Sequence, residues 1–105
     1  MKLVITDLVP TLDARLAAKV QAMCRNVRVT RDGYLRRGKR RDQWPADDWR
    51  APYRRALKHV FPNAWIYRGG HHLAVHASPP PAFAPEAGPC LFRICESANA
   101  VNVVH

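Results

Sequence analysis

The chain has 105 residues, of which 48% are hydrophobic and 24% charged, a balance that excludes wholesale disorder and predicts one globular domain over residues 1–105. Lys and Arg number 17 against 8 Asp and Glu, so the formal net charge is +9 and the isoelectric point is about 10.4. This positive charge predicts a polyanionic partner. Because no stretch has the length of a membrane span or the pattern of a signal peptide, we also expect a cytoplasmic protein with no membrane partner.

The chain begins with a predicted strand and a predicted helix. Residues 2–6, KLVIT, are apolar and β-branched enough for a buried strand. Pro10 then interrupts the chain, and Thr11 is in position to cap a helix. The apolar residues of this helix recur at helical spacing and predict its buried face: Leu12, Leu16, Val20 and Met23.

A hairpin and a loop are predicted next. VRVT, residues 27–30, alternates in polarity, Gly33 supplies a turn, and YLRR, residues 34–37, resumes as a second strand. The following GKRRDQWPADD, residues 38–48, is charged and contains Pro45. This composition predicts a surface loop.

A second amphipathic helix follows that loop. Asp47 or Asp48 can cap it, and Pro52 fits only if it lies in the first turn. Pro62 ends it. Its apolar residues fall on one face: Trp49, Tyr53, Leu57, Val60 and Phe61.

Residues 64–75 predict a second hairpin, with Gly69 and Gly70 as a two-residue turn. This register pairs Trp65 with Ala74 and Tyr67 with His72, and paired residues share a face. The predicted core face carries Ala64, Ile66, Leu73 and Val75. The other face carries Trp65, Tyr67, His72, Ala74 and His76.

The C-terminal part predicts a loop and two strands. Residues 78–89 contain five of the nine prolines, which predicts an extended loop, and residues 90–95 and 100–104 predict short final strands. Together the elements predict an α+β domain with two helices on an antiparallel or mixed sheet. The first six follow the βαββαβ order of a ferredoxin-like sheet, to which the last strands are added.

Positive charge is concentrated between residues 25 and 41, where eight Lys and Arg occupy seventeen positions and Asp32 is the one acid. Such a strip can bind a phosphate backbone while aromatic rings stack on unpaired bases, so we predict a small non-catalytic protein that binds RNA or DNA. The predicted contact residues, from this strip, the second helix and the second hairpin, are Arg25, Arg28, Arg31, Tyr34, Arg36, Arg37, Lys39, Arg40, Arg41, Arg50, Arg54, Arg55, Lys58, Trp65 and Tyr67.

The same charge fits a small inhibitor or adaptor that docks on an acidic or nucleic-acid-binding face of a larger protein machine. No nucleotide-binding, hydrolase-elbow or zinc-protease motif occurs, and we expect no cofactor. We also expect no metal site in the hairpin, because His72 and His76 on one strand lie about 13 Å apart. The histidines are interpreted as hairpin surface residues.

A further alternative comes from KHVFPNAWIYRGGHHLAVH, residues 58–76. This segment resembles the helix, hairpin and RxxGSHH stretch of HicA-type toxin ribonucleases, with Gly70 at the position of the family's serine. The resemblance implies metal-independent RNA cleavage by a histidine that follows the hairpin turn. By position that residue is His71, with His72 beside it.

Overall fold

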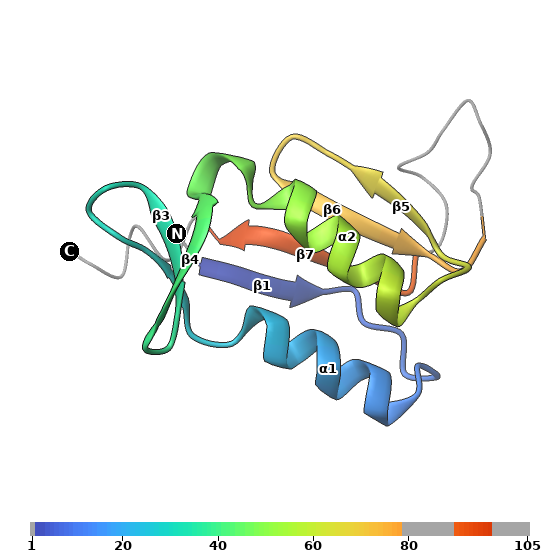
Figure 1. Ribbon diagram of the computed structural model, residues 1–105. Coiled ribbons are helices and arrows are strands. Elements are labelled where there is room, and N and C mark those ends of the chain that lie inside the picture. The colour runs from blue at the N-terminus through green and yellow to red at the C-terminus, as the bar shows by residue number, and fades with distance from the viewer. Residues whose placement is uncertain (1, 79–89, 98–105) are drawn as a thin grey trace.

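The main sheet joins strands from both ends of the described chain (Figure 1). The computed structural model describes residues 2–78 and 90–97, apart from the side chains at positions 41 and 42. The sheet has the strand order β1-β7-β6-β5, and every neighbouring pair is antiparallel. The strands are β1 (Lys2–Thr6), β5 (Trp65–Arg68), β6 (His72–His76) and β7 (Phe92–Ser97).

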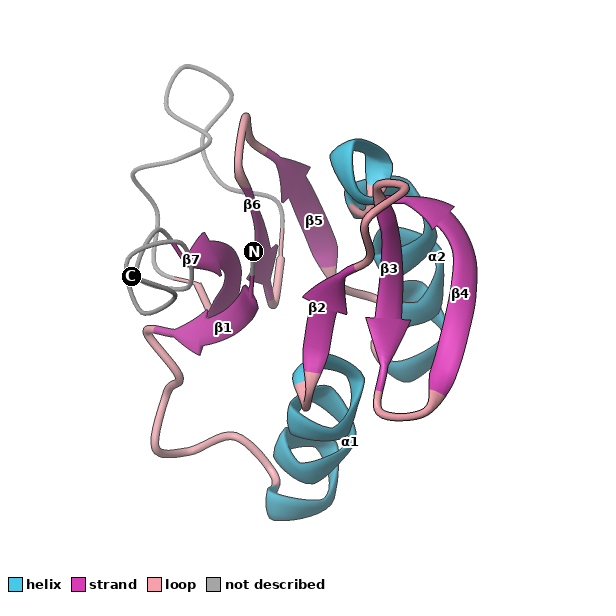
Figure 2. Ribbon diagram, turned by 90° about the vertical axis from the view of Figure 1, so that its left-hand side faces the viewer, coloured by secondary structure: helices cyan, strands magenta, loops and turns pink. Residues whose placement is uncertain are grey.

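Within the described residues, two α-helices, α1 (Ala14–Cys24) and α2 (Arg50–Val60), cover one face of this sheet (Figure 1). A second antiparallel sheet lies between the helices in the chain, and Figure 2 shows it apart from the main sheet. The α+β class predicted from the sequence is therefore confirmed. The strands of the second sheet are β2 (Val27–Val29), β3 (Tyr34–Arg37) and β4 (Arg40–Pro45).

The strand pairing differs from a ferredoxin-like sheet. That arrangement would place the hairpin of β2 and β3 in the same sheet as β1. Instead, β1 pairs with β7, and the hairpin forms its own sheet with β4. Order along the chain did not predict this partition, because hydrogen bonding between distant strands decides which of them share a sheet.

The loop predicted over residues 38–48 is wrong. The chain reverses at Gly38, whose φ of 58° glycine adopts without steric cost, and returns as β4. Pro45 is the last residue of β4, an edge strand of its sheet in which proline is tolerated, and the short 3-10 helix Ala46–Asp48 follows. A charged segment can therefore form a strand when its sheet lies on the surface.

The two helices begin later than their sequence signals indicated. Asp13, and not Thr11, caps α1: its carboxylate accepts hydrogen bonds from the backbone N–H groups of Arg15 and Leu16 at 2.9 and 3.2 Å. Neither Asp47 nor Asp48 caps α2, because both belong to the preceding 3-10 helix. Pro52 lies in the first turn of α2, as predicted.

The hairpin of β5 and β6 is shifted by two residues from the predicted register. Trp65 pairs with His76 and Arg68 with Leu73, so the connection is longer than the two glycines. Because the shift is an even number, each side chain keeps the face predicted for it. Ile66, Leu73 and Val75 are accordingly buried against the helices.

The core fills the space between the helices and the main sheet. Trp49 and Tyr53 on α2 meet edge to face, with ring centroids 5.6 Å apart. The Tyr53 hydroxyl donates to the Met23 carbonyl at 2.8 Å and thereby links α2 to α1. At the end of α1, burial raises the pKa of the Cys24 thiol to about 12, against an opposing effect of Arg37.

Phe92 and Ile94 contribute the β7 side of this core, so the predicted strand over residues 90–95 is confirmed in its main part. The strand predicted over residues 100–104 lies outside the described residues, as does the proline-rich loop apart from its first position, Ser78. In the described segments, no helix is long and apolar enough to cross a bilayer.

The cap at the start of α1 gives a direct test. We expect Asp13→Ala to lower the free energy of unfolding by about 1 kcal/mol, because two N–H groups of the first turn lose their acceptor. Thr11→Ala, at the cap position suggested by sequence, should change it by less than about 0.5 kcal/mol. Urea titrations of the two variants compare these positions, and equal losses would contradict the assignment of the cap.

Candidate nucleic-acid interface

Three arginine positions form one row across the second sheet. Arg28 on β2 pairs with Arg36 on β3, and Arg36 pairs with Arg41 on β4. Directly opposed residues in an antiparallel pair have their Cβ atoms about 5 Å apart, and like charges there destabilise the sheet. We call the sheet of β2, β3 and β4 the arginine sheet. A bound anion would offset the repulsion between its paired arginines.

Apolar side chains hold the opposite face of the arginine sheet against the core. Val27 and Leu35 are buried there, and Val29 pairs with Leu35 on the same face. The alternation along each strand therefore turns Arg28 and Arg36 away from the core. Arg28 is exposed, and Arg36 donates from Nε to the Gly38 carbonyl at 3.1 Å.

The single acid of the strip is held in the turn between β2 and β3. Asp32 accepts a hydrogen bond from the Thr30 hydroxyl at 2.5 Å, and the Thr30 oxygen accepts one from the Tyr34 N–H at 3.0 Å. Gly33 has the positive φ, 82°, that this turn requires. Asp32 therefore helps to hold the turn between β2 and β3.

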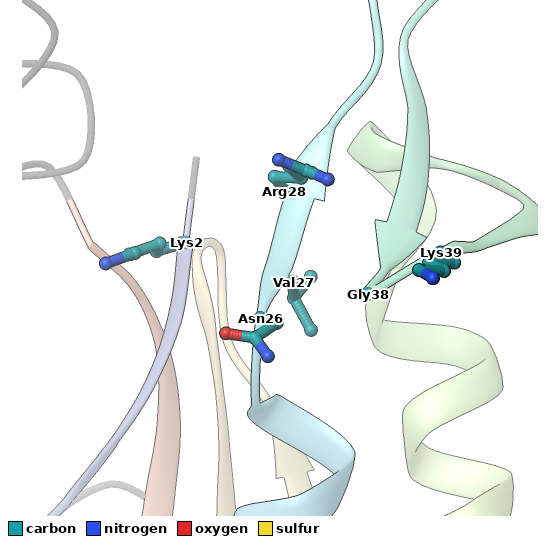
Figure 3. A pocket seen from close by; sticks show the side chains of 6 residues that line it. All are labelled: Lys2, Asn26, Val27, Arg28, Gly38 and Lys39. Atoms are coloured by element: carbon teal, nitrogen blue, oxygen red, sulfur yellow. The ribbon is translucent and has the colours of Figure 1, made fainter.

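A cavity of about 330 Å³ adjoins the arginine sheet where β1, β2 and the turn before β4 meet (Figure 3). Three cations from these elements line it, namely Lys2, Arg28 and Lys39. Asn26 adds a polar amide, and its φ of 54° marks the bend between α1 and β2. Arg28 belongs both to this cavity and to the row of arginines, so the two features are continuous.

A second basic surface lies between α2 and β5, and we call it the α2–β5 groove. Its volume is about 490 Å³, and the lining combines Arg54 and Arg55 of α2 with Trp65, Tyr67 and Arg68 of β5. The rings of Trp65 and Tyr67 are nearly parallel, with an interplanar angle of 15° and centroids 6.2 Å apart. The structure thus brings together four predicted contact residues, and Arg68 was missed.

The structure uses two of the predicted contact residues inside the fold. Arg50 donates from one guanidinium nitrogen to the carbonyls of Gly69 and Gly70, which fixes the turn before β6. Lys58 donates to the Ala64 carbonyl at 2.7 Å and closes the end of α2. The other predicted contacts outside the row and the groove are Arg25, Arg31, Lys39 and Arg40, which are exposed, and Tyr34 and Arg37, which are half-buried.

The turn before β6 also holds an acid–histidine pair that the sequence did not indicate. His71 has a side chain 86% exposed, and its Nδ1 lies 2.8 Å from Oε2 of Glu96 on β7. The other carboxylate oxygen accepts a hydrogen bond from Trp49 Nε1 at 2.8 Å. Glu96 is 25 positions from His71, so only the pairing of β6 with β7 places it there.

The other two histidines of this segment pack against the aromatic pair. His76 is buried with its ring centroid 6.0 Å from that of Trp65, and the His72 and Tyr67 centroids are also 6.0 Å apart. Across the residues that the structure describes, no three His, Cys, Asp or Glu side chains gather closely enough to hold a metal ion. The interpretation of the histidines as surface residues is therefore wrong for His76, which is buried in the packing of this sheet face, while His72 is half-buried beside it.

No protein-family model, curated protein or solved structure matches the chain. The resemblance of residues 58–76 to HicA-type toxins therefore rests on those residues alone. The function is accordingly argued from the surfaces and side-chain contacts of the protein itself.

The turn before β6 leaves no room for a side chain at Gly69, because an added methyl group would overlap the His72 imidazole. We expect Gly69→Ala to lower the free energy of unfolding by about 1–3 kcal/mol. Gly70→Ala is the matched control, since its methyl group would meet nothing within 4 Å. In a His72→Ala background the penalty of Gly69→Ala should largely disappear, and an unchanged penalty in urea denaturation would refute the steric explanation.

Proposed function

We propose that the protein binds nucleic acid and that the arginine sheet contacts the phosphate backbone. The observation that carries the proposal is the row formed by Arg28, Arg36 and Arg41 across three adjacent strands. Folding places Arg28 directly opposite Arg36, at a cost in stability, which is expected of a surface that meets an opposite charge in its functional state.

The chemistry of the row suits phosphate. A guanidinium group presents planar, paired donors that match two oxygens of one phosphate, whereas a lysine acts as a point charge. The cavity beside Arg28 continues the positive surface through Lys2 and Lys39, so a backbone can follow it beyond the sheet. A net charge of +9 would also speed the association with any polyanion.

The proposal includes a cytoplasmic location. Its support is that Cys24, Cys90 and Cys95 are free thiols in the structure, as is usual in a reducing compartment. A nucleic-acid partner is compatible with this location. The competing partner, an acidic or nucleic-acid-binding protein, would meet the same arginines, and the binding experiment separates the two.

The test measures the affinity for labelled RNA and DNA, single- and double-stranded, over a series of salt concentrations. We expect affinity to fall steeply with salt, and Arg28→Ala with Arg36→Ala to reduce the slope of log K against log salt by about 2, one per lost phosphate contact. The control is Arg15→Ala with Lys19→Ala, which removes the same charge from the exposed side of α1.

An equal effect of the control pair would mean that net charge alone attracts the nucleic acid and that the arginine sheet is not the site. Absence of binding to every oligonucleotide at low salt would contradict the proposal. In that case, a protein that binds with defined stoichiometry and depends on Arg28 and Arg36 would support the inhibitor or adaptor alternative.

The pair of His71 and Glu96 favours a second candidate function, metal-independent cleavage of RNA. The carboxylate holds Nδ1, which leaves Nε2 as the ring nitrogen for proton transfer on a side chain 86% exposed. In such a reaction Nε2 takes the proton of a 2′-hydroxyl, the 2′-oxygen bonds to phosphorus, and the 5′-oxygen leaves with a proton from solvent.

Incubation of RNA with the protein in EDTA tests this candidate. If His71 is the base, His71→Ala should abolish cleavage, and Glu96→Gln should lower its rate about 10- to 100-fold through loss of the orienting charge. His59→Ala, an exposed histidine on α2, is the control and should leave the rate unchanged. RNA that stays intact with the unaltered protein would eliminate the ribonuclease candidate and leave the binding proposal in place.

A further inference from the structure

The two basic surfaces are built for different parts of a nucleic acid. The arginine sheet places arginines at paired positions on neighbouring strands, whereas the α2–β5 groove combines cations with a stacked aromatic pair. Phosphates need only cations, but the flat face of a base needs an aromatic or guanidinium plane on which to stack. The groove therefore carries information about the ligand that the arginine sheet does not.

Trp65 and Tyr67 are fixed in a geometry that suits stacking. They are two positions apart on β5 and therefore lie on the same face of the strand, the one turned away from the helices, so the groove passes around the edge of β5 to reach them. The centroid distances to His76 and His72, both 6.0 Å, show that imidazoles of β6 support the two rings from one side. Both rings remain half-buried, so a ligand would meet rings that are already ordered and lose little side-chain entropy.

The cations lie along the same groove. Arg54 and Arg55 are exposed on α2, and Ala51, one helical turn before Arg55, leaves space between them and β5. Arg68 ends β5 and forms a salt bridge with Asp48 at 3.1 Å, so its positive charge is partly balanced in the groove. Arg54 and Arg55 are therefore the groove residues best placed for phosphate.

Duplexes do not fit these features. In a double helix the base faces are covered by their neighbours, so Trp65 and Tyr67 could contact a base only after it unstacks. The groove, at about 490 Å³, has the size of a small-molecule site and could hold only a few nucleotides. An extended acidic peptide along β5 would use the cations but not the parallel rings.

We propose that the α2–β5 groove is a subsite for single-stranded nucleic acid, with bases stacked on Trp65 and Tyr67 and phosphates bound by Arg54 and Arg55. This inference rests on the proposed function and adds to it a strand preference and a second point of contact. The arginine sheet binds backbone of either form, and the groove selects the unpaired form.

The experiment compares three labelled oligonucleotides of equal length at one salt concentration: a single strand, its duplex, and a single strand with abasic sites in place of bases. We expect Trp65→Leu with Tyr67→Leu to weaken binding of the single strand about 10- to 100-fold, and to leave the duplex and abasic strands within about twofold. The abasic strand keeps the phosphates, so it isolates the contribution of stacking.

Two further variants guard against a folding defect and separate this inference from the proposed function. Trp65→Phe keeps a ring at the position and should retain most of the single-strand affinity, while urea denaturation reports whether each variant is folded. Arg28→Ala with Arg36→Ala should weaken all three oligonucleotides alike.

Equal weakening of all three by the aromatic variant, or no weakening of any, would overturn the groove assignment while the proposed function stands. Failure of every oligonucleotide to bind the unaltered protein would overturn both. Displacement of the single strand by an acidic peptide, with no loss on the aromatic changes, would assign the groove to a protein partner instead.

Discussion

Strand β7 hydrogen-bonds to β1 on one side and to β6 on the other, and most of the structure depends on this central pairing. It joins the last described strand to the first and connects β1 to the rest of the sheet on which both helices pack. It also sets the position of Glu96, because the N–H of this residue bonds to the His71 carbonyl at 3.0 Å. The Glu96 carboxylate accepts a hydrogen bond from the Trp49 indole and contacts the His71 imidazole. Glu96 thereby connects the start of α2, strand β7 and the turn before β6.

Periodicity predicted the local elements well. The apolar spacing from Trp49 to Phe61 gave the buried face of α2, and the alternation from Trp65 to His76 assigned each side chain to its correct face even though the register was shifted by two. These patterns depend only on the helical and strand repeats, which any amphipathic element obeys. The predicted faces of the second hairpin were therefore correct although its turn was predicted too short.

Features that depend on contacts between distant segments could not be predicted in the same way. The segment from Arg40 to Pro45 has no apolar alternation, and its pairing with β3 makes it a strand. The pair of His71 and Glu96 requires the register of β6 and β7, which no local pattern encodes. The sequence did not indicate that Arg50 and Lys58 of α2 donate to backbone carbonyls. A cation that bonds to the backbone of a turn looks the same in the sequence as one that binds a ligand.

The position of β5 at the outer side of the main sheet has a consequence for the behaviour of the protein in concentrated solution. Among the described strands β5 is an edge of the main sheet, and an edge strand with an aromatic sequence such as WIY is a place where a strand of another chain can add. Arg54, Arg55 and Arg68 flank this edge. A second copy of the chain would bring the same cations against them, so the charge that attracts a polyanion also discourages edge-to-edge association and aggregation.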